Sequence, residues 1–191
     1  MRIGLFGGSF NPAHRGHAHV ALTGLTRLRL DRVWVMVTPG NPLKDAGHLA
    51  PLAARIASCR ALIDHPRVDV RAFEAHWHIR YSWQTVRRLK AAFPGVDFVW
   101  LMGADNLASF HRWQHWRRIA AAMPIAVIDR PGATLSVSSS RAAIALENAW
   151  LQETCAKSLP TRPAPAWTFI HAPRVPLSST ELRRGQKNDG R

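Results

Sequence analysis

The chain has 191 residues, of which 47% are apolar and 20% are charged, a globular composition that excludes global disorder. Its length predicts one domain, and no apolar run reaches the roughly 20 residues of a membrane span. The net charge of +14 favours anionic partners such as nucleic acid, acidic membrane or phosphorylated small molecules. The basic residues are spread along the chain, so a nucleic-acid-binding arm is not indicated.

The N-terminus and the cysteines both predict a cytoplasmic protein. The first ten residues, MRIGLFGGSF, hold one basic residue and a short apolar stretch before the glycines, which is unlike a signal peptide. Cys59 and Cys155 are far apart and form no CxxC pair. Neither a disulfide framework nor a cysteine zinc site is therefore expected.

Short apolar stretches alternate with helical stretches along the chain. Strands are expected at 2–6, 32–37, 67–72, 97–102, 124–128 and 166–170. Helices are expected at 16–29, 51–64, 82–92 (capped by Ser82), 140–152 and 178–185. A Trp-rich helical stretch is also expected after Gly103-Ala104-Asp105, to about residue 122. Residues 158–165 contain three prolines and are expected to form a loop. This alternation predicts an α/β fold with a mostly parallel sheet covered by helices on both faces, and ligands at the carboxyl ends of its strands.

A glycine turn, GGSFNPAHRGH at residues 7–17, joins the first expected strand to the first expected helix. Glycines let main chain approach a ligand closely, and a helix N-terminus attracts anions. His14 and His17 are three residues apart, so both can face a phosphate as charge builds up in a transition state. The segment is neither a Walker P-loop nor GxGxxG. A metal site of His14, His17 and His19 is not supported, because no carboxylate or cysteine stands at the usual ligand spacing.

This segment resembles the G-S/T-F-D-P-x-H-x-G-H signature of the nucleotidyltransferase superfamily, whose members join a nucleoside monophosphate unit to a phosphorylated acceptor and release pyrophosphate. The matching positions are Gly8, Ser9, Phe10, Pro12, His14, Gly16 and His17. Asn11 departs from the pattern, because aspartate is usual there. The resemblance implies a Rossmann-like nucleotidyltransferase fold with His14 and His17 as catalytic residues. It also implies an ATP-binding set that comprises Gly7, Gly8, Ser9, Phe10 and Gly16.

A second motif, LSSTELR at residues 177–183, lies near the other end of the chain. Alone, it is often only a capped helix, although hydroxyls and a two-pronged guanidinium also suit phosphate. It is similar to the family's second signature, I-S-S-T-x-I-R, and implies that Ser179 and Thr180 bind ATP and that Arg183 is catalytic. The resemblance then covers almost the whole chain, so residues 1–185 are expected to form a single domain and 186–191 a tail.

Three further segments resemble the bacterial nicotinate-nucleotide adenylyltransferase branch of that family. They are YSWQT at 81–85, MGADNL at 102–107 and FHRWQHW at 110–116, against the patterns Y-[ST]-x-x-T, G-[AQ]-D and F-x-x-W. The resemblance implies that Trp113 stacks on the nicotinate ring, an arrangement with a cation–π component. For the nicotinate carboxylate, the resemblance implies binding by main-chain amides near Gln114 together with Thr85. For ATP, it implies binding by Gly103 and Asp105, with Asp105 bonded to a ribose hydroxyl. The alternative for Trp113 is core or interface packing on an amphipathic helix. Trp116 is expected to have only such a packing role.

Three more basic residues are candidates for phosphate binding. Lys44 lies in TPGNPLKD, where the family carries a P-x-x-K-like loop. The resemblance implies that Lys44 is a catalytic cation that neutralises the triphosphate. The alternative is that Lys44 is an ordinary solvated side chain. Arg130 and Arg141 have no motif support.

The prediction is adenylyl transfer from ATP to nicotinate mononucleotide in NAD biosynthesis, with Mg²⁺ accompanying ATP and no membrane or specific nucleic-acid partner. Homo-oligomer formation and the role of residues 133–165 are left open. Alternatives are a sister enzyme such as pantetheine-phosphate adenylyltransferase or a cytidylyltransferase, and nicotinamide mononucleotide as acceptor. A non-enzymatic RNA-binding protein fits the charge, but the chain lacks an aromatic-rich RNA signature.

Overall fold

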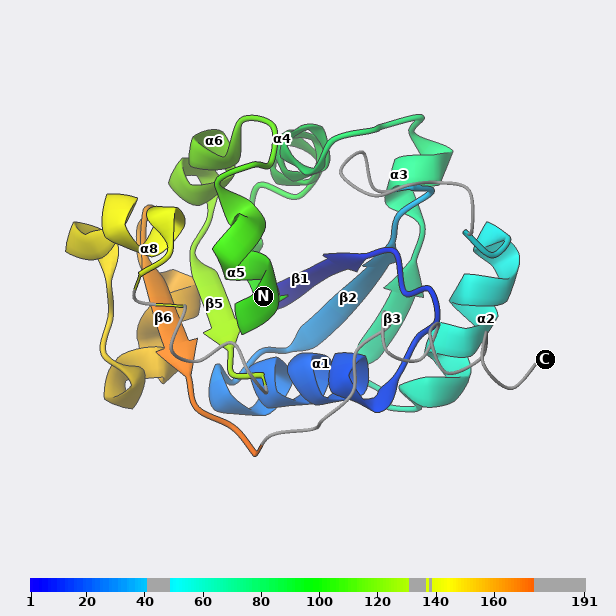
Figure 1. Ribbon diagram of the computed structural model, residues 1–191, viewed down its shortest axis with the longest axis horizontal. Helices are drawn as coiled ribbons and strands as arrows, with labels where there is room; N and C mark the ends of the chain where they lie inside the picture. Colours follow the sequence, from blue (N-terminus) through cyan, green and yellow to red (C-terminus); the bar gives the residue numbers. More distant parts are fainter. Residues whose placement is uncertain (41–48, 131–136, 138, 174–191) are drawn as a thin grey trace.

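A computed structural model of the chain describes residues 1–40, 49–130, 137 and 139–173. Its centre is a six-stranded sheet of order β3-β2-β1-β4-β5-β6, in which every pair of neighbouring strands is parallel (Figure 1). The strands are β1 (Arg2–Gly8), β2 (Arg32–Val37), β3 (Val68–Arg71), β4 (Asp97–Gly103), β5 (Ile125–Ile128) and β6 (Trp167–Ile170). The predicted parallel α/β sheet is confirmed, with each strand within about two residues of its expected bounds.

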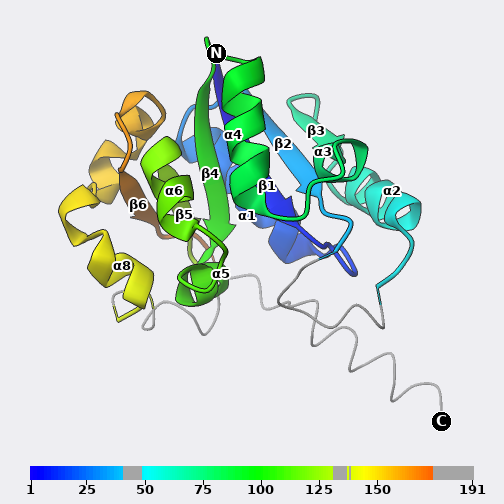
Figure 2. The same ribbon diagram turned by 90° about the horizontal axis from the view of Figure 1, so that it is seen from above.

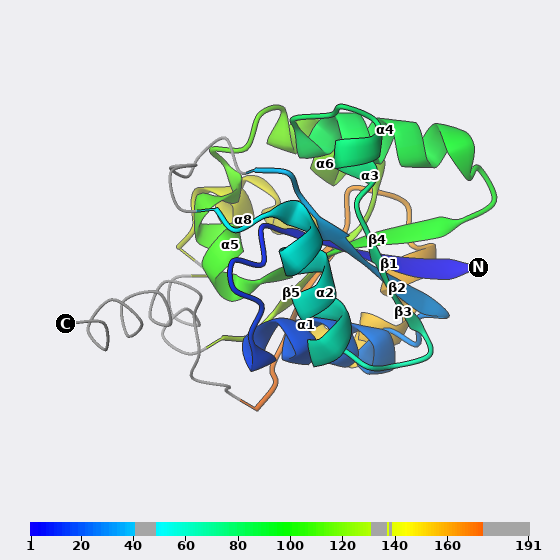
Figure 3. The same ribbon diagram turned by 90° about the vertical axis from the view of Figure 1, so that its right-hand side faces the viewer.

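Helices cover both faces of the sheet. The α-helices are α1 (Arg15–Arg27), α2 (Leu52–Leu62), α3 (Phe73–His76), α4 (Ser82–Ala92), α5 (Ala104–Phe110), α6 (Trp116–Ala122) and α8 (Arg141–Ala145). Two 3₁₀ helices, η1 (Glu147–Ala149) and η2 (Glu153–Thr161), follow them. Helices α1 and α2 lie on one face and α3, α4 and α6 on the other, as Figure 3 shows from the side. Figure 2 shows the second group from above.

Successive side chains of each strand enter two different cores, because strand side chains alternate between the faces of a sheet. The face under α4 and α6 has an aromatic layer, which includes Trp34, Trp100, Met102, Phe110, Trp116 and Trp167. The face under α1 and α2 has a mainly aliphatic layer, hereafter the aliphatic layer, which contains Phe6 and Phe10 and also Val20, Leu25, Val33, Val35, Val99 and Leu101. Strand β4 shows the alternation directly: Val99 and Leu101 enter one layer, and Trp100 and Met102 the other.

Four expectations about secondary structure are wrong in detail. The helix expected at 140–152 is the short α8 followed by the 3₁₀ helix η1, which ends at Ala149. The helical stretch expected after Asp105 begins earlier, at Ala104, and is two helices, because residues 111–115 form a turn that ends at His115 with a left-handed φ of 53°. The loop expected at 158–165 begins later, because η2 continues to Thr161 with Pro160 inside it. Ser82 is the first helical residue rather than the cap; the preceding Tyr81 N–H donates to Gln84 Oε1 at 3.2 Å. The helix expected at 178–185 and the tail at 186–191 lie outside the described residues.

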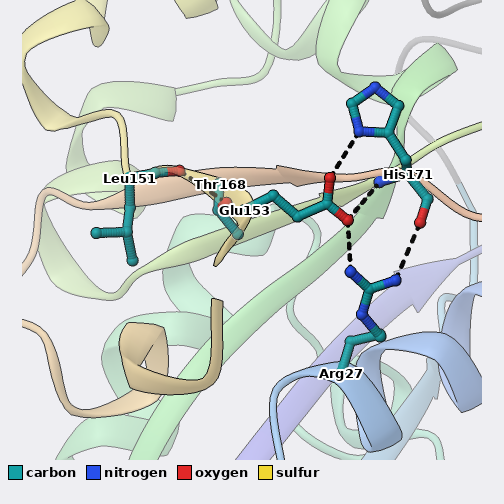
Figure 4. A network of polar contacts seen from close by, with 5 residues as sticks. All are labelled: Arg27, Leu151, Glu153, Thr168 and His171. Atoms are coloured by element: carbon teal, nitrogen blue, oxygen red, sulfur yellow. Dashed lines mark hydrogen bonds and ion pairs between the residues drawn. The ribbon is translucent and has the colours of Figure 1, made fainter. Parts of the chain in front are cut away.

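Polar contacts tie the end of β6 to α1 (Figure 4). The Glu153 carboxylate accepts from Arg27 Nη2 at 2.5 Å and from the His171 N–H at 3.1 Å, and lies 2.6 Å from His171 Nδ1. Arg27 Nη1 also donates to the His171 carbonyl at 3.2 Å. No helix in the described ranges is both long and apolar enough to cross a membrane.

The chain reverses its direction of travel across the sheet at the centre. From β1 it moves to β2 and β3 on one side, and β4 then returns to the other side of β1 and leads to β5 and β6. In an open parallel sheet, such a switch point forms a crevice beyond the carboxyl ends of the strands, where ligands bind. The glycine turn after β1 and the Gly103-Ala104-Asp105 segment after β4 are therefore expected to flank one site.

Candidate active site

The two histidines of the first motif are held at the N-terminus of α1. His14 is the N-cap residue, and its Nδ1 accepts from the Gly16 N–H at 3.1 Å. His17 Nδ1 accepts from the His14 N–H at 3.1 Å, and the two rings lie 3.8 Å apart. Because Nδ1 is the acceptor in both neutral rings, each ring carries its proton on Nε2, which is then a donor. Both side chains can therefore donate to an anion.

The glycine turn itself is closely packed. Phe10 is 1% exposed, has a left-handed φ of 47°, and packs edge to face against Phe6 at 5.4 Å and His17 at 4.8 Å. The Phe10 ring also covers Gly8, where an added Cβ would lie 3.1 Å from the ring. Close packing of this kind fixes the main chain that precedes α1.

Arg130 joins the ends of β4 and β5 to α1. A Cβ at Gly16 would lie 2.9 Å from His14 Cε1 and 3.1 Å from Arg130 Nη2, and a Cβ at Gly103 only 2.6 Å from Arg130 Cδ. Arg130 Nη1 also pairs with Asp105 Oδ2 at 3.5 Å. These two glycines thus make room for a guanidinium beside the histidines. Burial, and then the charge of Arg130, lower the pKa of nearby His19.

The predicted ring site lies on the aromatic layer. Trp113 packs edge to face against Trp100 at 5.9 Å and Phe110 at 5.4 Å. Gln114 Oε1 accepts from Trp83 Nε1 at 3.0 Å, which joins the turn before α6 to α4. Half-buried Trp113 has two aromatic supports that hold its indole in place. Trp116 is only 8% exposed, which confirms its assignment to packing.

Thr85 is fully buried, and its hydroxyl donates to Glu74 Oε1 at 3.0 Å. Glu74 is itself 4% exposed, and burial raises its pKa to about 7, against a smaller lowering by the Thr85 hydrogen bond. Sequence reasoning missed Glu74. The only signal is an acidic residue within the apolar run Ala72-Phe73-Glu74-Ala75.

Besides Thr85, Trp113 and Gln114 on the aromatic side, the structure places nine predicted site residues at the carboxyl edge, and four others lie outside the described residues. The described site residues at the carboxyl edge are Gly7, Gly8, Ser9, Phe10, His14, Gly16, His17, Gly103 and Asp105. Lys44, Ser179, Thr180 and Arg183 lie outside the described residues. Arg130 joins the site although no motif supported it, whereas Arg141 is an exposed residue at the start of α8. Among the described residues, no three His, Cys, Asp or Glu side chains gather as metal ligands.

Comparison with known protein families shows the class of protein to which this chain belongs. A family model described as cytidylyltransferase-like matches residues 5–185, so the chain belongs to the cytidylyltransferase-like nucleotidyltransferases. A Plasmodium falciparum nicotinic acid mononucleotide adenylyltransferase, solved in complex with NaAD, has the same fold, with a TM-score of 0.73 at 16% identity. The match covers 96% of this chain and 82% of that one.

Curated relatives show to which particular family within this class the chain belongs. A protein of Methylorubrum extorquens (strain PA1) is 58% identical over 96% of this chain and 99% of its own length, and one of Agrobacterium fabrum is 57% identical over 98% and 100%. A third, from Brucella abortus (strain 2308), is 56% identical over 97% and 96%. All three are described as "Probable nicotinate-nucleotide adenylyltransferase". The chain belongs to the nicotinate-nucleotide adenylyltransferase family, as its motifs predicted.

Proposed function

We propose that the chain transfers the adenylyl group of ATP to nicotinate mononucleotide, which gives nicotinate adenine dinucleotide and pyrophosphate in NAD biosynthesis. One observation carries this proposal: the N-terminus of α1, with two histidines whose Nδ1 atoms accept from main-chain N–H groups, lies at the sheet edge where β4 leads into α5 and the aromatic turn at Trp113. A phosphate site and a ring site on one edge suit a substrate that has both groups. The family relationship supports the same reaction.

In the proposed reaction, a phosphate oxygen of the mononucleotide attacks the α-phosphorus of ATP in line. The new P–O bond forms as the bond to the β-phosphate oxygen breaks, and pyrophosphate leaves with that electron pair. Phosphate oxygens are nucleophilic at neutral pH, so no general base is needed. Catalysis then consists of positioning, hydrogen bonds from His14 and His17, and charge neutralisation by Arg130, with Lys44 and Arg183 as further proposed cations.

Mg²⁺ is proposed to enter with ATP. This ion keeps several waters and is usually held by substrate phosphates and one or two carboxylates rather than by a full protein cage. The exposed Asp105 carboxylate at the sheet edge is compatible with such an arrangement, although its proposed role is a bond to a ribose hydroxyl. The metal would supply charge neutralisation along the triphosphate.

The remaining assignments follow from the motifs. The proposed ATP-binding residues are Gly7, Gly8, Ser9, Phe10, Gly16, Gly103, Asp105, Ser179 and Thr180. Trp113 is proposed to stack on the nicotinate ring, and main-chain amides near Gln114 to bind its carboxylate. Since the Thr85 hydroxyl is engaged by Glu74, the proposed contribution of Thr85 comes from the main chain of the first turns of α4. Both cysteines are free thiols, which is compatible with a cytoplasmic enzyme.

The test is pyrophosphate release with ATP and Mg²⁺, with nicotinate mononucleotide, nicotinamide mononucleotide and phosphopantetheine as separate acceptors. We expect the nicotinate form to be strongly preferred. Release with another acceptor alone would discard the ring-site assignment and keep the phosphate site. No release with any acceptor would refute the proposed reaction.

A further inference from the structure

Arg55 is a buried arginine of α2 that belongs to none of the motifs. It is 3% exposed, and burial lowers the pKa of its guanidinium, although an arginine keeps its proton under all ordinary conditions. A buried charge is costly unless hydrogen bonds compensate it. The burial of the Arg55 charge must therefore be compensated by hydrogen bonds, and these show what Arg55 holds in place.

Four hydrogen bonds of the Arg55 guanidinium end on main-chain carbonyls. Its Nη1 donates to the carbonyls of Ser9 and Thr38, both at 2.7 Å. Its Nε donates to the carbonyl of Ala50 at 2.8 Å, and its Nη2 to that of Pro39 at 3.3 Å. A planar guanidinium can bond in several directions at once, whereas a lysine ammonium is a compact charge without this fork.

These four carbonyls come from segments that meet beside the predicted phosphate site. Ser9 lies in the glycine turn, while Thr38 and Pro39 precede residues 41–48 and Ala50 follows them. Two further bonds strengthen the junction: the Thr38 N–H donates to the Gly8 carbonyl at 2.9 Å, and the Ala50 N–H donates to Asn11 Oδ1 at 3.1 Å. Ala50 is thus held through both its N–H and its carbonyl. Asn11, where the family usually has aspartate, takes part in the same junction.

We propose that Arg55 is a positioning residue that fastens the glycine turn at Ser9 to the main chain on either side of residues 41–48. The kinetic consequence rests on the proposed function, because Ser9 is a proposed ATP ligand and Lys44 stands in the sequence between the anchored ends. A displacement of a binding group by about 1 Å can cost roughly a hundredfold in rate. Arg55 acts on the reaction through these segments and does not touch the substrate.

The first test, hydrogen exchange by mass spectrometry, does not depend on activity. Arg55→Lys keeps the charge and loses the fork; Arg60→Lys, on the exposed side of α2, is the matched control. We expect amides in peptides that cover residues 7–12 and 38–52 to exchange roughly tenfold faster in Arg55→Lys, because local opening sets their rate. Peptides from residues 97–110 should be unchanged in both variants. Unchanged exchange at 7–12 and 38–52 would overturn the proposal.

A second variant covers the case in which Arg55→Lys does not fold. Arg55→Met removes all four hydrogen bonds and leaves no charge to bury. It should show the same local increase in exchange. A uniform increase over all peptides, without the local excess, would mean that Arg55 serves global stability only, and the proposal would fail.

The second test is a double-mutant cycle in pyrophosphate release. Arg55→Lys should lower kcat roughly 30-fold and change both KM values less than about threefold, because a misplaced group mainly affects the transition state. In the Lys44→Ala background, Arg55→Lys should lower kcat less than about threefold, because residues that act together are not additive. Equal losses in the two backgrounds would overturn the link to Lys44. If the wild-type chain releases no pyrophosphate, the proposed function fails, and the exchange test still decides whether Arg55 anchors these segments.

Discussion

The two faces of the sheet are built from different side chains, and the two halves of the proposed site follow that difference. The aromatic layer contains four buried tryptophans, Trp34, Trp100, Trp116 and Trp167, and Trp77, Trp83 and Trp113 pack against it. The aliphatic layer contains no tryptophan among its described members. The α1 histidines belong to the second face, and the proposed ring site to the first.

This division suits the chemistry proposed for each face. Small residues let α1 approach the sheet: a Cβ added at Gly24 would lie 2.8 Å from Leu101 Cδ1, so this side chain would have to shift. A helix this close brings its N-terminal amides to the strand ends, where the phosphate site is proposed. Indoles on the other face offer large flat surfaces, of which Trp113 is only partly covered. In the proposed site, the alternation within each strand thus supports two kinds of recognition on one edge.

The largest expected effect is on the phosphate half. His17→Ala removes a donor to the charge that develops in transfer, so kcat should fall by roughly 10²–10³-fold, with KM changed less than about threefold. Steady-state pyrophosphate release with both substrates varied measures this split. His65→Ala, in the segment before β3 and away from the carboxyl edge, is the control and should leave kcat unchanged. An unchanged kcat with a raised KM would contradict the role of His17.

The next effect concerns the stability of the aromatic face. Glu74 has a pKa of about 7 in the folded chain, against an ordinary value of 4.5. Between these values the folded state binds more protons than the unfolded state, so stability falls as pH rises from about 4.5 to above 7, by up to roughly 3 kcal/mol. Glu74→Gln does not titrate and can still accept from Thr85, so it should remove this part of the pH dependence.

Urea unfolding of wild type and Glu74→Gln between pH 4.5 and 8 measures the difference. The exposed Glu147→Gln provides the control for loss of one carboxylate. Parallel stability curves for wild type and Glu74→Gln over this range would show that Glu74 has no raised pKa.

Local pattern predicted much of the fold, and long-range contacts account for what it missed. The strand at 32–37 was predicted with its bounds, because an apolar, β-branched run ends there at a Thr-Pro-Gly turn. His14 and His17 could be selected as candidates from the sequence because they lie three residues apart, next to the glycines of the same motif. Arg55 was not found, since its bonds join residues up to 46 positions apart. Arg130 had no motif support for the same reason: it reaches Gly16 from the end of β5.

The smallest expected effect is on the ring half and completes the comparison. Trp113→Ala should raise KM for nicotinate mononucleotide roughly tenfold and change kcat and the KM of ATP little, because stacking of a flat base on an aromatic side chain contributes about 1–3 kcal/mol to binding. Trp113→Phe keeps an aromatic face and should recover most of the affinity. Thermal unfolding must accompany the kinetics, since Trp113 also packs on Trp100 and Phe110. A loss in kcat with unchanged KM would place Trp113 with the phosphate chemistry, and the two faces would then not divide the work as proposed.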